Sequence, residues 1–192
     1  MQRLRVTFSR GEELKYLSHL DMMRLWERAL RRAGVAIAYS HGFSPHPKLS
    51  MAAPLPLGVT SEGELMDIFV RRRISPYVLP KALAEQMPKG IEIIGVSQVA
   101  PEAPALQTQL RRADYRVEIE TNESADTVKA AIDSFLALKE LPWQHKRNEE
   151  LRSYDLRALV ERIWLIGLRE GVCILGMCLR VDNSASGRAE QV

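Results

Sequence analysis

The order of strand-like and helix-like segments over residues 2–99 constrains the fold of this chain more than any other feature. Residues 2–9 place apolar side chains at every second position, which is typical of a half-buried strand. Residues 18–33 then repeat apolar side chains at helical spacing, beginning with a capping-box pattern at Ser18 and ending at Gly34. These two periods predict a strand followed by an amphipathic helix.

The same reasoning extends through the rest of the first half. Prolines and glycines separate short runs of apolar residues, which favours further strands and one more helix. A strand, helix, strand, strand, helix, strand order is typical of a ferredoxin-like unit, in which helices pack on one face of an antiparallel sheet. To complete that order we expect strands over residues 49–57 and 64–73, a helix over 75–87 and a strand over 91–99.

A partial second copy of this order follows a stretch rich in Pro and Ala over residues 100–106, which is typical of a linker. We therefore predict an α+β fold of antiparallel sheets with helices on one face, arranged as tandem ferredoxin-like domains over residues 1–100 and 101–192. In the second domain we expect a strand over 115–120, a helix over 124–138 capped by Ser124, and strands over 142–146 and 172–181. Residues 156–166 fit either a strand or a helix, and residues 183–192 are expected to form a frayed tail.

The composition is that of a protein with a buried core and no membrane span. The chain has 192 residues, of which 46% are hydrophobic, and its longest apolar runs end well short of the roughly 20 residues that a spanning helix needs. Residues 1–6 alternate like a strand and lack the apolar core and cleavage site of a secretory signal. We therefore expect a cytoplasmic protein without a membrane partner.

The positive charge is concentrated in the first half of the chain. Residues 1–100 hold 14 Lys and Arg against 9 Asp and Glu, whereas residues 101–192 hold 13 against 15. Such an excess of cations suits an anionic partner. Part of it lies in a row on the polar side of the predicted first helix: Arg24, Arg28, Arg31 and Arg32.

The segment Tyr39–Ser50 carries the most chemistry in the chain. It places two histidines, an aromatic ring and a lysine among two prolines and a glycine that fix an irregular backbone. Phe43 can stack on an unpaired base while Lys48 and the helix arginines take phosphates, so the segment predicts a platform for single-stranded RNA. Tyr39 can add a hydroxyl donor or a second ring.

The histidines leave other interpretations open. His41 and His46, joined by His19 or Asp21, are a ligand set that a divalent metal accepts. Alternatively, His41 or His46 acts as general acid and base in RNA cleavage without a metal, or the imidazoles only bond loop carbonyls and shape the backbone. The run Arg71–Arg73 fits either a phosphate contact or a solvated strand end.

The two cysteines, Cys173 and Cys178, lie five positions apart in one predicted strand. At that spacing the thiols point to opposite faces, so they cannot bond to each other within the strand, and buried apolar packing is expected for both. The sequence also lacks the Cys-x3-Cys-x2-Cys triplet of a radical iron–sulfur cluster. We therefore expect no cofactor to be bound by this chain itself.

Four segments carry a family resemblance: Tyr16-Leu-Ser-His-Leu-Asp21, Arg31-Arg-Ala-Gly34, Tyr39–Ser50 and Leu55-Pro-Leu-Gly-Val-Thr-Ser-Glu62. Together they resemble the radical-SAM-linked family of uncharacterised proteins called DUF2344. The resemblance implies a partner, a B12-binding radical SAM enzyme that holds SAM, the iron–sulfur cluster and cobalamin. It also implies a tRNA or rRNA substrate, because family members are often encoded near ribonuclease G and ribosomal protein genes. It transfers no catalytic residue.

We therefore predict an accessory protein without activity of its own, which binds RNA and presents it to the radical SAM enzyme. Two alternatives remain: a small RNA-processing or RNA-modifying enzyme that uses His41 or His46, and a module that docks the radical SAM enzyme without touching RNA. The residues expected at the binding surface are His19, Asp21, Arg24, Arg28, Arg31, Arg32, Tyr39, His41, Phe43, His46 and Lys48.

Overall fold

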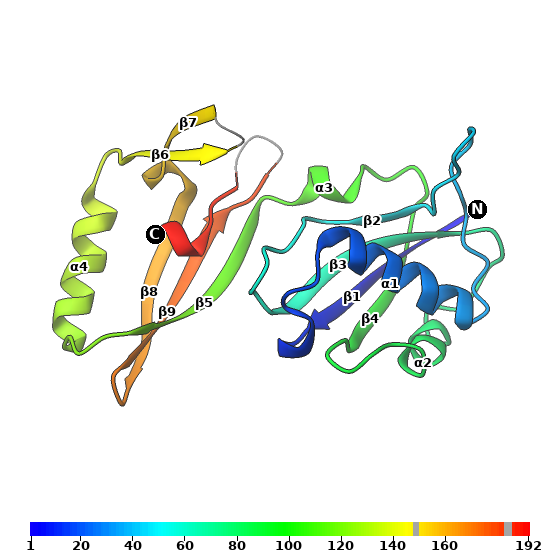
Figure 1. Cartoon of the computed structure of the whole chain (residues 1–192), viewed down its shortest axis with the longest axis horizontal. Coiled ribbons are helices and arrows are strands. Elements are labelled where there is room, and N and C mark those ends of the chain that lie inside the picture. The colour runs from blue at the N-terminus through cyan, green and yellow to red at the C-terminus, as the bar shows by residue number, and fades with distance from the viewer. Residues whose placement is uncertain (148–149, 183–185) are drawn as a thin grey trace. The chain divides into compact units, whose positions relative to one another are not determined.

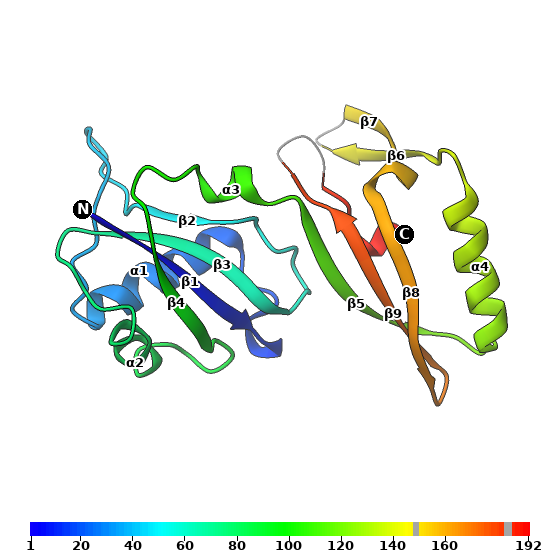
Figure 2. The same cartoon turned by 180° about the vertical axis from the view of Figure 1, so that it is seen from behind.

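The structure is a computed structural model that describes residues 1–147, 150–182 and 186–192. The chain divides into two compact units, Met1–Gln109 and Leu110–Val192, and each is treated by itself below (Figures 1 and 2). The sequence places the boundary at residue 100, whereas the first unit continues to Gln109. Among the described residues, no helix has both the length and the apolar character needed to cross a membrane.

The first unit is built on a four-stranded antiparallel sheet with the strand order β2-β3-β1-β4 (Figure 1). Its elements follow the predicted strand, helix, strand, strand, helix, strand order, and a short helix is added at the end. They are β1 (Gln2–Arg10), the 3₁₀ turn η1 (Glu12–Leu14), α1 (His19–Arg32), β2 (Leu49–Met51), β3 (Ser61–Val70), α2 (Leu79–Ala84), β4 (Ile93–Val99) and α3 (Leu106–Gln109).

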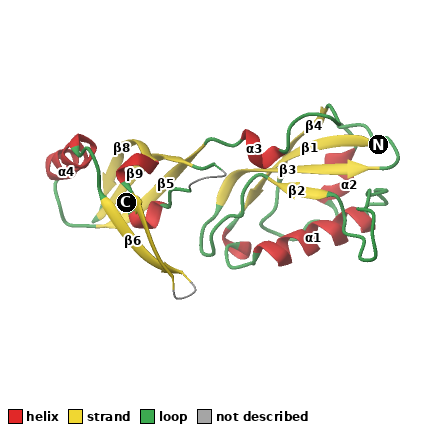
Figure 3. Ribbon diagram, turned by 90° about the horizontal axis from the view of Figure 1, so that it is seen from above, coloured by secondary structure: helices red, strands yellow, loops and turns green. Residues whose placement is uncertain are grey.

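Helix α1 forms where the sequence predicts it. The Ser18 hydroxyl accepts a hydrogen bond from the Asp21 backbone N–H, and Gly34 follows the helix with a φ of 70° that favours glycine. The apolar stripe of α1 is buried against the alternating apolar residues of β1, and the rings of Phe8 and Trp26 meet edge to face with centroids 4.8 Å apart. Residues of α1 and α2 join one core cluster, so both helices cover the same face of the sheet (Figure 3).

The opposite face of this sheet holds a buried ion-pair cluster. The Asp67 side chain is fully buried and accepts hydrogen bonds from the guanidinium groups of Arg3 and Arg5. Arg3, itself 3% exposed, also donates to the carbonyl oxygens of Ala103 and Pro104. Residues 100–109 are therefore fixed to the first unit rather than forming the free linker that the sequence suggests.

Three predicted elements of the first unit are shorter or shifted. The strand expected over 49–57 ends at Met51, because Pro54 and Pro56 have no backbone N–H to donate to a neighbouring strand. The helix expected over 75–87 is restricted to α2, and a turn on the Ser75 carbonyl precedes it. The strand expected over 64–73 ends at Val70, so the three following arginines lie beyond it.

The second unit contains a three-stranded antiparallel sheet with the order β5-β9-β8 and a separate hairpin of β6 and β7. It starts with strand, helix and strand as predicted and continues with strands, and the ambiguous stretch 156–166 forms a 3₁₀ turn and most of β8. The tandem ferredoxin-like arrangement therefore stays a prediction. The elements are β5 (Arg112–Glu120), α4 (Ala125–Ala137), β6 (Pro142–Arg147), β7 (Glu150–Asp155), η2 (Arg157–Leu159), β8 (Val160–Arg169), β9 (Val172–Arg180) and η3 (Ala189–Gln191).

The core of the second unit lies between one face of its sheet and α4. Cys173 and Cys178 are both buried and free on β9, as expected. Ala189 and Val192 pack against this core, so the end of the tail is not frayed as the sequence suggests. Residues 183–185 of the same predicted tail lie outside the described residues.

Candidate nucleic-acid interface

The connection between α1 and β2 forms a hairpin-like loop that projects from the first unit near the C-terminal end of α1 (Figure 1). Tyr39 and Pro47 form an isolated antiparallel bridge, and the Ser40 N–H donates to the His46 carbonyl at 2.8 Å. The His46 N–H donates to the Ser40 hydroxyl at 3.0 Å. These bonds close the base of the loop and leave residues 41–45 as its tip.

The tip presents the ring of Phe43 to solvent. Gly42 adopts a φ of 129°, which an L side chain rarely tolerates, so glycine at this position permits the turn that carries the next residue outward. Phe43 has a relative exposure of 110%, the highest among the exposed large hydrophobic side chains. An apolar ring held fully in water gains nothing for folding, and it is available to stack on a flat partner.

The base of the loop is hydrogen-bonded to the end of β3, which brings a second cationic segment to the same place. The Phe69 N–H donates to the Lys48 carbonyl at 3.0 Å, the Ala38 N–H donates to the Phe69 carbonyl at 2.8 Å, and the Arg71 N–H donates to the Ala36 carbonyl at 2.7 Å. The two chain segments that form the stem of the loop are thus joined to the residues around Arg71, which the sequence places far away.

Tyr39 connects the loop to α1. Its hydroxyl donates to the Glu27 carboxylate at 3.1 Å. Burial and this hydrogen bond raise the pKa of Tyr39, and the positive charges of Arg31 and Arg71 act in the opposite direction. Arg31 from the last turn of α1 and Arg71 from the end of β3 are therefore both near the Tyr39 hydroxyl, beside the loop.

We define the loop face as the exposed loop together with these neighbours: Arg31, Tyr39, His41, Phe43, His46, Lys48 and Arg71. Within the described parts of the chain, no carboxylate lies within the 4 Å ion-pair distance of Arg31, Lys48 or Arg71. Arg28, one turn earlier on α1, is exposed and likewise without an ion pair in these parts. These charges are therefore free to bind an anion.

The remaining predicted arginines of α1 have intramolecular partners. Arg24 lies 3.4 Å from Asp21, which also accepts a hydrogen bond from the Ser18 hydroxyl. Arg32 donates to the side chain and the carbonyl oxygen of Gln86, which ties the end of α1 to the segment after α2. Asp21, Arg24 and Arg32 therefore each have a partner within the first unit, and their part in binding stays a prediction.

The set of His19, His41 and His46, which the sequence leaves open as one alternative for a metal site, is not assembled among the described residues. His19 lies in the first turn of α1, about 20 Å along the helix axis from its last turn, where the loop departs. His41 and His46 are exposed at the loop. Among the described residues, no three His, Cys, Asp or Glu side chains are close enough to hold a metal ion, and in that part of the chain neither loop imidazole has a carboxylate within ion-pair distance to orient it.

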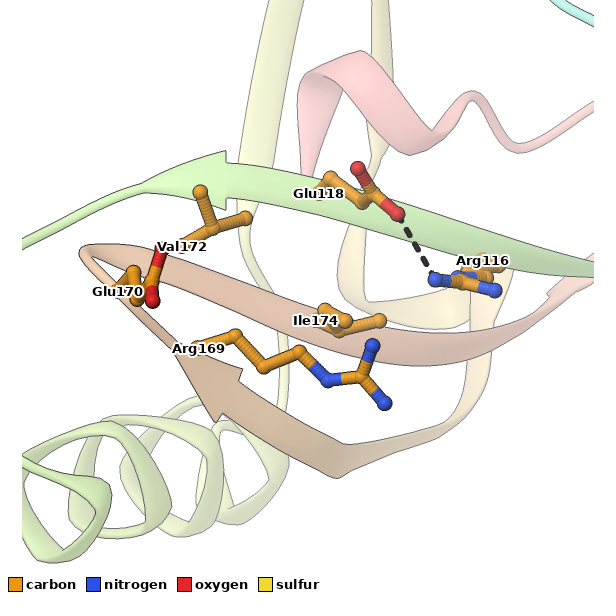
Figure 4. A pocket seen from close by; sticks show the side chains of 6 residues that line it. All are labelled: Arg116, Glu118, Arg169, Glu170, Val172 and Ile174. Carbon is orange, nitrogen blue, oxygen red and sulfur yellow. Dashed lines mark hydrogen bonds and ion pairs between the residues drawn. The ribbon is translucent and has the colours of Figure 1, made fainter.

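A depression lies on the sheet of the second unit, on the face away from α4. It has a volume of ≈ 320 Å³ and is lined by side chains of β5, β9, the end of β8 and the β8–β9 turn, with Ile174 among them (Figure 4). Arg116 pairs with Glu118 at 2.9 Å, and Arg169 and Glu170 lie across the depression from them. Two cations and two anions balance each other, so this depression lacks the net positive charge of the loop face.

The sequence predicts the loop itself but not Glu27 as the partner of Tyr39. For Arg71 it leaves open whether the side chain contacts phosphate or only ends a strand in solvent. The signal for Arg71 is the run of three arginines directly after a strand, and only the pairing of β3 with the loop stem shows where that run lies. No periodicity in the sequence reveals the bond between Tyr39 and Glu27, because the two residues belong to different elements.

The fold and this face define an α+β protein of antiparallel sheets with an exposed aromatic and cationic loop. The sequence profile of a family described as an uncharacterized protein conserved in bacteria (DUF2344) matches residues 3–188. The chain belongs to this family. Among curated proteins, none matches the chain.

Proposed function

We propose that this chain is a cytoplasmic RNA-binding accessory protein that presents RNA to a B12-binding radical SAM enzyme. The observation that carries the RNA-binding part is the fully exposed Phe43 ring above a base that holds Lys48, Arg31 and Arg71 without intramolecular ion pairs in the described chain. A ring for base stacking beside free cations for phosphates is the combination that single-stranded nucleic acid requires.

Two observations support the assignment of the cofactors to a partner enzyme: the family resemblance and the state of the two cysteines. Cys173 and Cys178 are both buried, and burial raises the pKa of the Cys178 thiol, which disfavours the thiolate form that metal ligation needs. In this proposal SAM, the iron–sulfur cluster and cobalamin belong to the partner enzyme, and tRNA or rRNA is the ligand of this chain.

The RNA-binding part is tested by fluorescence anisotropy with a labelled single-stranded RNA and the matching duplex. We expect Phe43→Ala to weaken single-strand binding by about 5-fold to 150-fold, which corresponds to roughly 1–3 kcal/mol for one stacked base. Lys48→Ala should weaken binding to every sequence similarly, because it removes a phosphate contact. Tyr77→Ala is a matched control, since Tyr77 is 87% exposed but lies next to α2. Wild-type affinity in the Phe43 and Lys48 variants would refute the proposal.

The same preparation separates the accessory function from an enzyme that uses His41 or His46. Both histidines are exposed and lie within a few residues of Phe43 in the loop, which supports testing them as acid and base. We expect no RNA cleavage products from the purified chain, with or without EDTA. If the wild-type chain yields specific cleavage products that disappear in His46→Ala, the accessory function is refuted and RNA processing is favoured.

A further inference from the structure

The strand β5 lies at one edge of the sheet in the second unit (Figure 1). In the first unit, β1 lies between two neighbours, β3 and β4. In the second unit β5 pairs with β9 as β1 pairs with β3, but among the described residues no strand pairs with β5 on its other side as β4 pairs with β1. The outer edge of β5 is therefore a place where a further strand can be added.

The backbone hydrogen bonds show which residues of β5 face this edge. The Val181 N–H donates to the Arg111 carbonyl at 2.9 Å, and at the other end the Thr121 N–H donates to the Gly171 carbonyl at 2.8 Å. Hydrogen-bonded pairs alternate along an antiparallel ladder, so the odd-numbered residues bond β9 and the even-numbered residues direct their N–H and C=O groups outward. In the described chain, no backbone partner bonds the outward groups of Arg112, Asp114, Arg116, Glu118 or Glu120.

This edge also lacks features that prevent strands from pairing. β5 is nine residues long, contains no proline and pairs with β9 without a register shift. β8, at the opposite edge of the same sheet, is interrupted by two register shifts, between Val160 and Arg162 and between Leu165 and Gly167. Bulges protect sheet edges from association, so β5 rather than β8 is the edge suited to pairing.

The charges along β5 form a pattern that is complementary to itself. The even-numbered side chains are exposed and alternate in sign in the order Arg112, Asp114, Arg116 and Glu118. If two β5 strands run antiparallel about a two-fold axis through Tyr115, Arg112 of each copy lies opposite Glu118 of the other. Asp114 of each copy likewise lies opposite Arg116. All four opposed pairs then join unlike charges, which stabilises a sheet, whereas like charges in these positions destabilise it.

The pattern selects this register over the neighbouring ones. A two-fold axis through Arg116 would place Arg116 opposite itself and Asp114 opposite Glu118. An axis through Asp114 would place Asp114 opposite itself and Arg112 opposite Arg116. Both neighbouring registers therefore oppose like charges, so only the axis through Tyr115 among these three satisfies every pair.

The present partners of these charges are exposed and easily exchanged. Arg116 lies 2.9 Å from Glu118, and Arg112 lies 2.6 Å from Glu161 on β8. Exposed ion pairs of this kind contribute little to stability, so their replacement by pairs between two copies costs little. On the opposite face of β5, Tyr115 and Val117 already pack against the core, and the axis would bring the two Tyr115 side chains together.

We infer that this chain forms a symmetric homodimer in which the β5 strands of two copies pair antiparallel about a two-fold axis through Tyr115. The two three-stranded sheets become one sheet of six strands, and the outward backbone groups of β5 gain partners. The charge pattern makes a second copy the occupant of the edge, because the same four side chains supply both halves of every pair. The dimer does not depend on RNA binding.

Two charge variants of the full chain test this interface by sedimentation equilibrium. Arg112→Glu/Arg116→Glu makes all four positions acidic, and Asp114→Lys/Glu118→Lys makes all four basic. Each variant alone opposes only like charges, so the dissociation constant of its dimer should rise by about 10-fold or more above the wild-type value. An equimolar mixture opposes unlike charges again, so it should form a one-to-one heterodimer.

A cysteine at the axis tests the register independently of the charges. Residue 115 would form a non-hydrogen-bonded pair with its own copy, in which Cα atoms are about 4.5 Å apart. A disulfide spans that distance, so Tyr115→Cys should give a covalent dimer on oxidation. Val117→Cys is the matched control, because its residue lies opposite Ala113 and its thiol should stay uncoupled.

The outcomes decide the inference in each case. Arg72→Glu/Arg73→Glu changes the net charge equally within the first unit and should leave the dimer intact. A wild-type chain that is monomeric at every concentration accessible to sedimentation would overturn the dimer. A dimer that both β5 variants leave unchanged, or equal cross-linking of Tyr115→Cys and Val117→Cys, would overturn the β5 interface. If a charge variant does not fold, the comparison of the two cysteine variants still decides the register.

Discussion

Replacing Asp67 by Asn tests how the first unit holds residues 100–109 on its sheet. The Asp67 carboxylate accepts four hydrogen bonds of 2.6–3.1 Å from Arg3 and Arg5 and has no exposed surface. These bonds also raise the pKa of Arg5, because they favour its charged form. The substitution keeps the shape of the side chain but leaves the buried Arg3 guanidinium without a counter-charge.

The expected loss in the free energy of unfolding follows from the burial of this ion pair. Removing one partner of a buried ion pair typically costs about 3–5 kcal/mol, because the remaining charge stays desolvated. With a urea m value of about 2 kcal/mol/M, the unfolding midpoint of the first unit should fall by roughly 2 M. Arg3 also anchors Ala103 and Pro104, so residues 100–109 should become sensitive to limited proteolysis.

The assay is urea denaturation followed by far-ultraviolet circular dichroism. Glu13→Gln is the matched control, because Glu13 forms an exposed ion pair with Lys89 and its loss should leave the midpoint unchanged. The double variant Arg3→Met/Asp67→Leu should recover part of the lost stability, since it removes the buried charge of Arg3 and leaves only Arg5, whose side chain is 21% exposed, without its carboxylate partner. If Asp67→Asn lowers the free energy of unfolding by less than about 1 kcal/mol, the reasoning is refuted, because a buried charge without a partner should destabilise the unit more than that.

Two further stability predictions concern other sites. Gly176→Ala should destabilise the second unit by about 1–3 kcal/mol, because the added methyl group overlaps the Trp164 ring, and the double variant Gly176→Ala/Trp164→Leu should recover part of this loss in thermal melts. Burial raises the pKa of Glu64, so its contribution to folding is most favourable below its unfolded pKa and is lost as pH rises through the folded value. The stability of Glu64→Gln relative to the wild type should therefore increase from pH 4 to pH 8. A difference in stability that does not change with pH would contradict a raised pKa of Glu64 in the folded state.

The regular elements of the first unit were predictable because their hydrophobic periods agree with local capping signals. Ser18 and Gly34 bound α1 in the sequence and in the structure. The length of β2 was harder to predict. The predicted strand included Pro54 and Pro56, although neither residue has a backbone N–H to donate to a sheet.

The binding surfaces were predictable only as separate segments. The loop of residues 39–48 is recognisable from its composition, but its junction with Arg71 depends on backbone pairing between distant segments. Residues 100–106 have the composition of a linker, but the buried Arg3 guanidinium binds two of their carbonyl oxygens and the Leu106 side chain is buried, so they are fixed to the first unit. Local patterns therefore gave the elements, while contacts between distant residues determine which side chains act together.

RNA binding at the loop face is tested most directly by the salt dependence of the affinity for single-stranded RNA. Four free cations on or beside the loop face, Arg28, Arg31, Lys48 and Arg71, predict a slope of about −3 in a plot of log Kobs against log salt concentration, at about −0.7 per phosphate. Arg31→Ala/Arg71→Ala should reduce this slope to about −1.4, and the control Arg116→Ala/Arg169→Ala in the second unit should leave it unchanged. A slope that is the same in the Arg31/Arg71 variant as in the wild type would contradict RNA binding at the loop face.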